Sequence, residues 1–248
     1  MGRANQAQIV FFLMKISELR QKYKLARKRP KGLRFFVELC EEAKESAIEN
    51  ERNSGRRFDD DAVAFLTEDF QNQLAEKGFE AVKVFWSLSY CQGDGVAFYG
   101  CVFSDDLKIK DAEAKKLIER LEKAGDEISI EITGANNWYH HRNSMTVEID
   151  FEHESDEEDL PARLKIARPV WREEFEDYLS EKVKEISTEL EKSGYAEIDY
   201  HYEDETISQD LSESENLYEK DGMRAMSEFE FESWRKEQGL NGLFAVAA

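Results

Sequence analysis

The chain has few cysteines and no long hydrophobic run. Cys40, Cys91 and Cys101 are the only three cysteines in 248 residues, too few for a disulfide framework, and their spacing matches no zinc motif. The apolar run at residues 9–14 is far shorter than the roughly 18 residues that span a bilayer. Basic residues follow it, and no small-residue cleavage site does. These absences predict a cytoplasmic protein with reduced, mostly buried thiols and no membrane association.

Motifs for nucleophilic catalysis and phosphate binding are also missing. The chain contains no Gly-x-Ser-x-Gly, and its glycine-rich segment 93–95 lacks the Lys and Ser/Thr of a P-loop. Among the four histidines, His140 and His141 form a cluster beside Tyr139 and Arg142, but no pair has a spacing typical of metal ligands. The sequence therefore predicts no catalytic residue, no metal site and no cofactor. A His- or metal-dependent hydrolase centred on His140 and His141 stays open as an alternative.

Basic residues are scarce over most of the chain, which leaves a net charge of −20. Residues 1–34 are the exception, because they contain ten Lys or Arg and one acid, a charge of +9. The other 214 residues carry 24 bases and 53 acids, a charge of −29. With 41% hydrophobic residues the chain is expected to fold around a core despite this charge. A basic head on an acidic body indicates an internal contact, a polyanion-binding arm or two faces for two partners.

Hydrophobic periodicity predicts both helices and strands. Apolar residues three and four positions apart indicate helices over residues 5–29, 33–50, 59–77, 171–193 and 206–217, and a weaker helix over residues 223–238. Alternating apolar residues indicate strands over residues 84–90, 96–100, 127–133, 145–151 and 198–202. Glycines at positions 78, 125 and 194 are each expected to cap a helix that leads directly into a strand.

The expected fold is α+β, an antiparallel sheet of about five strands with helices packed on one face, preceded by an N-terminal helical arm. Residues 1–55 are assigned to the arm, whose first helix is basic. Residues 56–225 are assigned to the α+β domain and residues 226–248 to a C-terminal tail.

The most informative local pattern is a β-hairpin around the segment Gly-Asp-Gly at 93–95. Residues 89–95 (Ser-Tyr-Cys-Gln-Gly-Asp-Gly) resemble an S-Y-S/C-Q-G-D-G hairpin found in uncharacterised proteins of tailed bacteriophages and prophages. Residues 139–145 resemble a His/Ser-rich segment of that group, and residues 200–222 resemble its C-terminal pattern. The resemblance covers roughly residues 60–225. It implies a phage-type accessory protein in a bacterial host cytoplasm and transfers no activity.

Residues 148–159 form an acidic stretch without a Lys or Arg. Glu148, Asp150 and Glu152 alternate with apolar residues, so a strand would hold their carboxylates on one open face, about 6.6–7 Å apart. Successive phosphates along one DNA strand have a similar spacing. The predicted partner-binding residues are Glu148, Asp150, Glu152, Glu154, Asp156 and Glu157. A solvated face that serves only solubility explains the pattern equally well.

The basic arm supplies candidate nucleic-acid-binding residues, because lysine and arginine pair with phosphates. These candidates are Lys24, Arg27, Lys28, Arg29 and Lys31. A contact of the arm with the acidic body, within one chain or in a homodimer, is the simpler interpretation of the same residues.

The leading hypothesis is a non-enzymatic, phage-type accessory protein. It would bind a host defence or nucleic-acid-handling protein through the acidic surface, as a DNA mimic, and inhibit or modulate it. The alternatives are a nucleic-acid or nucleoprotein binder that uses the basic arm, and the hydrolase described above.

Overall fold

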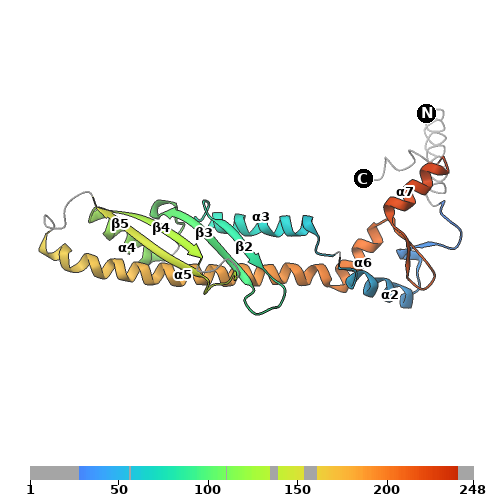
Figure 1. The fold of residues 1–248 in the computed structure, drawn as a ribbon, viewed down its shortest axis with the longest axis horizontal. Coiled ribbons are helices and arrows are strands. Elements are labelled where there is room, and N and C mark those ends of the chain that lie inside the picture. Colours follow the sequence, from blue (N-terminus) through green and yellow to red (C-terminus); the bar gives the residue numbers. More distant parts are fainter. Residues whose placement is uncertain (1–27, 56, 110, 135–138, 154–160, 240–248) are drawn as a thin grey trace, which may run out of the picture. The chain divides into compact units, whose positions relative to one another are not determined.

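The chain folds as an α+β protein with two antiparallel sheets, one of three strands and one of four (Figure 1). This confirms the predicted fold class. The computed structural model describes residues 28–55, 57–109, 111–134, 139–153 and 161–239. No helix in these ranges is long and apolar enough to cross a membrane. Contacts divide the chain into two units, Phe58–Tyr200 and a second that joins Met1–Arg57 to His201–Ala248. Residues 201–225 thus group with the start of the chain, whereas the sequence-based division placed them with the α+β domain.

The unit Phe58–Tyr200 is built on the four-stranded sheet, whose strand order is β2-β3-β4-β5. Its strands are β2 (Lys83–Ser87), β3 (Gly95–Phe103), β4 (Asp126–Gly134) and β5 (Met145–His153). Its helices are α3 (Asp60–Glu76), the 3-10 turn η2 (Ser104–Asp106), α4 (Ala112–Lys123) and α5 (Ala162–Tyr202). The last two residues of α5 belong to the other unit. Both predicted hairpins, β2–β3 and β4–β5, are confirmed.

One face of this sheet is buried under helices and the other is open. In β4, Ile128, Ile130 and Ile132 are at most 1% exposed, whereas the alternate residues Glu127 and Glu131 are exposed. This is the period-two pattern of a strand that buries one face. The helices α3, α4 and α5 lie against the buried face, as predicted.

Helix α5 crosses the buried face from β5 to the β2–β3 hairpin. Near its start, Arg172 donates a hydrogen bond to the carbonyl of Phe151 in β5, 3.4 Å away. Further along, the Ser187 hydroxyl donates to the carbonyl of Val96 in β3, 2.5 Å away. Its apolar stripe supplies side chains to the core over more than five turns, and the buried ones include Phe175, Leu179, Val183, Ile186 and Leu190.

The predicted fifth strand at 198–202 was wrong, because these residues continue α5. Gly125 does end α4 and leads into β4, with a φ of +86°. Gly194 instead lies inside α5, where an added Cβ would be 2.4 Å from Leu88 Cδ1 and 2.7 Å from Phe70 Cζ. The glycine therefore marks a close approach of the helix to its neighbours. Ile198 lies four residues further on the same face and is 9% exposed, so its apolar character also suits a helix.

The second unit contains a smaller sheet with strand order β1-β6-β7. Its strands are β1 (Arg34–Phe35), β6 (Leu217–Tyr218) and β7 (Arg224–Met226). Its helices are the 3-10 turn η1 (Phe36–Glu38), α2 (Glu41–Arg52), α6 (Asp204–Glu213) and α7 (Glu228–Glu237). Buried Phe36, Leu39, Ala43, Ala47, Ile207, Leu211 and Tyr218 form its core.

Two sequence-based boundaries change in this unit. The helix predicted from residue 33 begins at Glu41, because residues 34–38 form β1 and η1. The weak helix predicted over residues 223–238 is α7, which opens with a capping box between Ser227 and Glu230. It buries Phe231 completely, so the part of the chain assigned to a tail takes part in the core. Most of the predicted first helix, at residues 5–29, lies outside the described residues.

A buried cluster of charges fixes the start of α5 to β4. The Asp126 carboxylate accepts hydrogen bonds from Arg168 Nε at 2.9 Å and from Arg172 Nη2 at 2.6 Å, and the side chains of Asp126 and Arg168 are 0% and 3% exposed. Burial alone would raise the pKa of Asp126. The hydrogen bonds and charges of the two arginines outweigh burial, and they hold the pKa below its ordinary value. The ionised carboxylate of Asp126 is thus the negative charge that both arginines pair with.

We expect Gly194→Ala to lower the free energy of unfolding by about 1–3 kcal/mol, because the methyl group overpacks the contact with Leu88 and Phe70. Alanine favours a helix over glycine by about 1 kcal/mol, so a gain in stability would contradict the close approach. Urea unfolding gives the measurement. Lys192→Ala, at an exposed position of the same helix, is the control and should stay within about 0.5 kcal/mol of the parent protein.

We expect Asp126→Asn to lower the free energy of unfolding by about 3–5 kcal/mol at neutral pH, because Arg168 then lies buried beside a neutral amide. The folded pKa of Asp126 is below its unfolded value of about 3.9, so the carboxylate stabilises the fold above that pH. This contribution is lost as the pH falls through the folded pKa. Unfolding curves of both proteins between pH 7 and about pH 2 should therefore converge at the acid end. A stability difference between the two proteins that stays constant from pH 7 to about pH 2 would contradict the ionised state of Asp126. The control Asp150→Asn, at an exposed position, should not lose stability in this way.

Candidate functional site

The loop between β2 and β3 is organised around one carboxylate. Asp94 accepts hydrogen bonds from the Ser87 hydroxyl at 2.8 Å and from the backbone N–H groups of Ser89 and Cys91, both at 2.7 Å. Burial would raise the pKa of Asp94, but these donors together hold it below its ordinary value. Residues 88–94 thus form a seven-residue loop closed on its own aspartate, where the sequence had indicated a tight turn.

Tyr90 fastens this loop to α5. Its backbone has a φ of +58°, which is unusual for a residue other than glycine. Its hydroxyl donates a hydrogen bond to the Asp199 carboxylate, and its ring lies 4.6 Å from that of Tyr195 between centroids. The hydrogen bond to Asp199 is the main cause that raises the pKa of Tyr90 to about 12.

The two N-terminal motifs of the family resemblance lie against each other. A Cβ at Gly93 would be 2.2 Å from the Tyr139 ring, and one at Gly95 would be 2.7 Å from the carbonyl of His140. Only a residue without a side chain lets residues 139–141 approach this closely. The Ser-Tyr-Cys-Gln-Gly-Asp-Gly loop and the Tyr-His-His segment are therefore one packed substructure.

The two histidines have separate structural surroundings. His141 Nδ1 accepts a hydrogen bond from the backbone N–H of Asn143 at 3.0 Å, and the Ser144 hydroxyl donates to the His141 carbonyl at 2.8 Å. The His140 ring stacks on Phe85, with centroids 5.8 Å apart. Within the described ranges, no group of three or more His, Cys, Asp or Glu residues is placed to hold a metal ion. The two rings thus make separate contacts within the unit, one by stacking and one by hydrogen bonding.

The acidic strand is β5, and its carboxylates lie on the open face. Glu148, Asp150 and Glu152 are exposed, while Val147, Ile149 and Phe151 between them are partly buried. Three further predicted partner-binding residues, Glu154, Asp156 and Glu157, lie outside the described residues.

The neighbouring strand adds two carboxylates that the sequence analysis missed. The register of β4 with β5 sets Glu131 opposite Glu148 and Glu127 opposite Glu152. We call the five residues Glu127, Glu131, Glu148, Asp150 and Glu152 the acidic patch. None of them forms an ion pair with any residue that the structure describes. The alternation of Glu127, Ser129 and Glu131 with isoleucines was the signal that could have revealed the β4 contribution.

Strand β3 borders the acidic patch with exposed side chains of another kind. Phe103 is 51% exposed and pairs with Ser129, which in turn pairs with Asp150, so these three residues form one row across the open face. Cys101 is exposed and pairs with Glu131. The prediction of mostly buried thiols was wrong, since Cys40 and Cys91 are exposed as well. Basic Lys83 lies on β2, at the opposite edge of the sheet.

The predicted nucleic-acid-binding residues are described only in part. Lys24 and Arg27 lie outside the described residues, and Lys28 and Lys31 are exposed. Arg29 forms an ion pair with Glu38, and its guanidinium lies 5.1 Å from the centre of the Phe35 ring. Arg29 therefore has a structural role within its own unit.

Comparison with known proteins places the chain in a family. A family model described as a domain of unknown function (DUF8835) matches residues 63–208, more than half of the chain. The chain belongs to this family. No curated protein and no solved structure matches it. The DUF8835 region contains the Asp94 loop, the whole four-stranded sheet and the acidic patch, and the family description assigns no activity to them.

We expect Asp94→Asn to lower the free energy of unfolding by about 1 kcal/mol or more. The carboxylate accepts from four donors, the Ser89 hydroxyl at 3.1 Å included, and the amide, which has one oxygen, leaves part of them unpaired. Urea unfolding, with hydrogen exchange of the Ser89 and Cys91 amides, measures the loss of the loop. Gln92→Ala, at an exposed position in the same loop, should change stability by no more than about 0.5 kcal/mol. Equal losses of unfolding free energy in the two variants would contradict the inference that the Asp94 hydrogen bonds stabilise the loop.

Proposed function

We propose that this protein is a non-enzymatic binding protein whose acidic patch engages a basic surface of a partner protein. The observation that carries the proposal is the pair of glutamates facing glutamates, Glu131 with Glu148 and Glu127 with Glu152. Directly opposed residues on neighbouring strands have Cβ atoms about 4.5–5.5 Å apart, and like charges there destabilise the sheet. Folding therefore gives no reason for this arrangement, whereas a cationic partner would relieve it.

The geometry of the patch favours a protein partner with arginine or lysine side chains. Phe103 and Asp150 are two strands apart, about 10 Å, with the small Ser129 between them. A cationic side chain placed over Ser129 would contact the aromatic ring on one side and the carboxylate on the other. A negatively charged nucleic acid would be repelled by the same five carboxylates.

We further propose that the partner is a host defence or nucleic-acid-handling protein, which the chain inhibits or modulates as a phage-type accessory protein in the host cytoplasm. Two features support this. The loop and the Tyr-His-His segment resemble those of tailed-phage proteins. A nucleic-acid-binding groove is basic, and carboxylates on an open strand, about 6.6–7 Å apart, are suited to occupy it in place of phosphates.

We expect the triple variant Glu148→Gln, Asp150→Asn, Glu152→Gln to fold with unchanged or higher stability, because it removes exposed charges and two like-charge contacts. Its association with a partner captured from bacterial lysate should be about tenfold slower at low salt. The parent protein's association rate should fall as salt rises, since exposed charges are screened within about 10 Å at 0.1 M salt.

The matched control is the triple variant Glu173→Gln, Glu174→Gln, Glu176→Gln, which changes the net charge equally at exposed positions of α5. Its association rate should stay close to that of the parent protein. Equal slowing in both triple variants would assign the effect to net charge. Salt-independent association of the parent protein would show that the patch serves solubility alone.

A further inference from the structure

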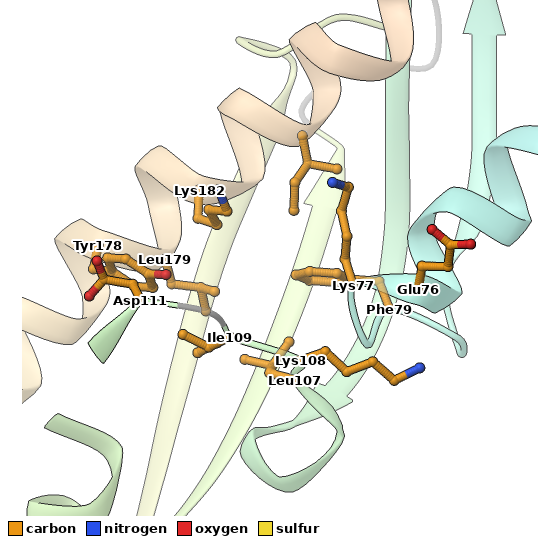
Figure 2. A pocket seen from close by; sticks show the side chains of 11 residues that line it. Glu76, Lys77, Phe79, Leu107, Lys108, Ile109, Asp111, Tyr178, Leu179 and Lys182 are labelled. Atoms are coloured by element: carbon orange, nitrogen blue, oxygen red, sulfur yellow. The ribbon is translucent and has the colours of Figure 1, made fainter. Parts of the chain in front are cut away.

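A cavity of about 190 Å³ lies between α5, the end of α3 and the segment that joins η2 to α4 (Figure 2). Its inner lining is apolar, since Phe79, Leu179 and Ile186 are at most 3% exposed. Leu107 and Ile109 complete this lining. Apolar clefts favour the apolar part of a ligand, and sites for drug-sized molecules measure about 300–1,000 Å³. The volume of this cavity therefore favours a ligand smaller than a drug-sized molecule.

The wall formed by the segment after η2 is held by backbone contacts. The N–H of Lys108 donates to the carbonyl of Lys77 at 3.1 Å, and the Lys108 ammonium donates to the carbonyl of Ala75 at 2.8 Å. An added Cβ at Gly78 would lie 2.1 Å from the carbonyl oxygen of Asp106, so the two segments are in direct contact. These contacts hold residues 106–108 against the end of α3.

Two ammonium groups stand at one end of the cavity. In Figure 2, Lys77 extends from the end of α3 towards α5 and Lys182 projects from α5, while Lys108 is turned away. Lys77 Nζ lies 2.9 Å from Glu189 and Lys182 Nζ lies 2.9 Å from Glu185. These glutamate side chains are 55% and 54% exposed. Exposed ion pairs contribute little, so an incoming anion can replace the glutamates at small cost.

The negative groups of the lining lie elsewhere. Asp111 lies beside Tyr178 in Figure 2, and its carboxylate accepts hydrogen bonds from the first N–H groups of α4, including Ala114 at 2.8 Å. Its charge is therefore engaged in capping the helix. Glu76, the last residue of α3, lies to the right of Phe79 in the same view, away from Lys182. The end with Lys77 and Lys182 remains the favourable place for a negative charge.

We propose that this cavity binds a short-chain aliphatic carboxylate. The carboxylate lies between the ammonium groups of Lys77 and Lys182, and the chain contacts Phe79, Leu179 and Ile186. Both parts are required, because acetate has no chain to bury and an aliphatic amine has the wrong charge. This site lies among the helices and loops of the buried side of the sheet, and it does not depend on the function proposed for the acidic patch.

The full-length protein, labelled at its Ile and Leu methyl groups, would be titrated with hexanoate and followed by NMR. The methyl signals of Ile109, Leu179 and Ile186 should shift in a saturable way with hexanoate, and they should show no saturable shift with acetate or hexylamine. Saturation by hexylamine at equal concentrations would overturn the proposal, because the cavity would then select only for apolar character. Absence of shifts at these methyl groups with hexanoate would overturn it as well.

The double variant Lys77→Gln, Lys182→Gln should bind hexanoate at least about tenfold more weakly, since two charge-assisted contacts are lost. Lys192→Gln, at an exposed position of α5 outside this cavity, should bind like the parent protein. Unchanged affinity in the folded double variant would overturn the assignment of the carboxylate. If the double variant does not fold, Lys182→Gln alone replaces it and should still weaken binding measurably.

Discussion

The packing of α5 across one face of the four-stranded sheet is the contact on which the rest of this unit depends. It is fixed at three places that differ in chemistry. At its start, Arg168 meets the buried carboxylate of Asp126. Midway, the Ser187 hydroxyl satisfies the carbonyl of Val96, and near its end the missing side chain of Gly194 admits Leu88 and Phe70. Ion pairing, hydrogen bonding and steric fit thus select one position of the helix along the sheet.

Because the helices bury a single face, the alternation of the strands determines which residues remain outside. Asp126 and Glu127 show the consequence, since the first is buried against Arg168 and the second is exposed on the acidic patch. A shift of the register by one residue would exchange the two faces. Placing Glu127 against Arg168 would then leave the isoleucines of β4 in water. The paired arginine and the isoleucines therefore enforce the outward position of the glutamates, even though their mutual repulsion opposes it.

The sequence predicted the elements whose signal is local and periodic. The hairpins β2–β3 and β4–β5, the open face of β5 and the class of the fold follow from alternation alone. The prediction that Gly194 ends a helix was wrong. A glycine after Leu-Glu-Lys-Ser has the same local pattern whether it caps a helix or lies in the middle of one, in close contact with a neighbouring ring. Which occurs depends on Phe70, far away in the chain. The sequence analysis found only the β5 part of the acidic patch for a similar reason. Which residue lies opposite Glu148 is set by pairing between strands and not by the local pattern.

The polar residues of the β2–β3 loop and the carboxylates of the open face differ in their contacts within the unit. Ser87, Ser89 and Asp94 hold one another in the loop, and Gly93 and Gly95 make room for residues 139–141. Each of these positions thus takes part in the packing of the unit. The side chains without such a structural use are the exposed carboxylates of β4 and β5, whose charges face one another. This repulsion between opposed glutamates is the observation on which the binding role proposed for the acidic patch rests.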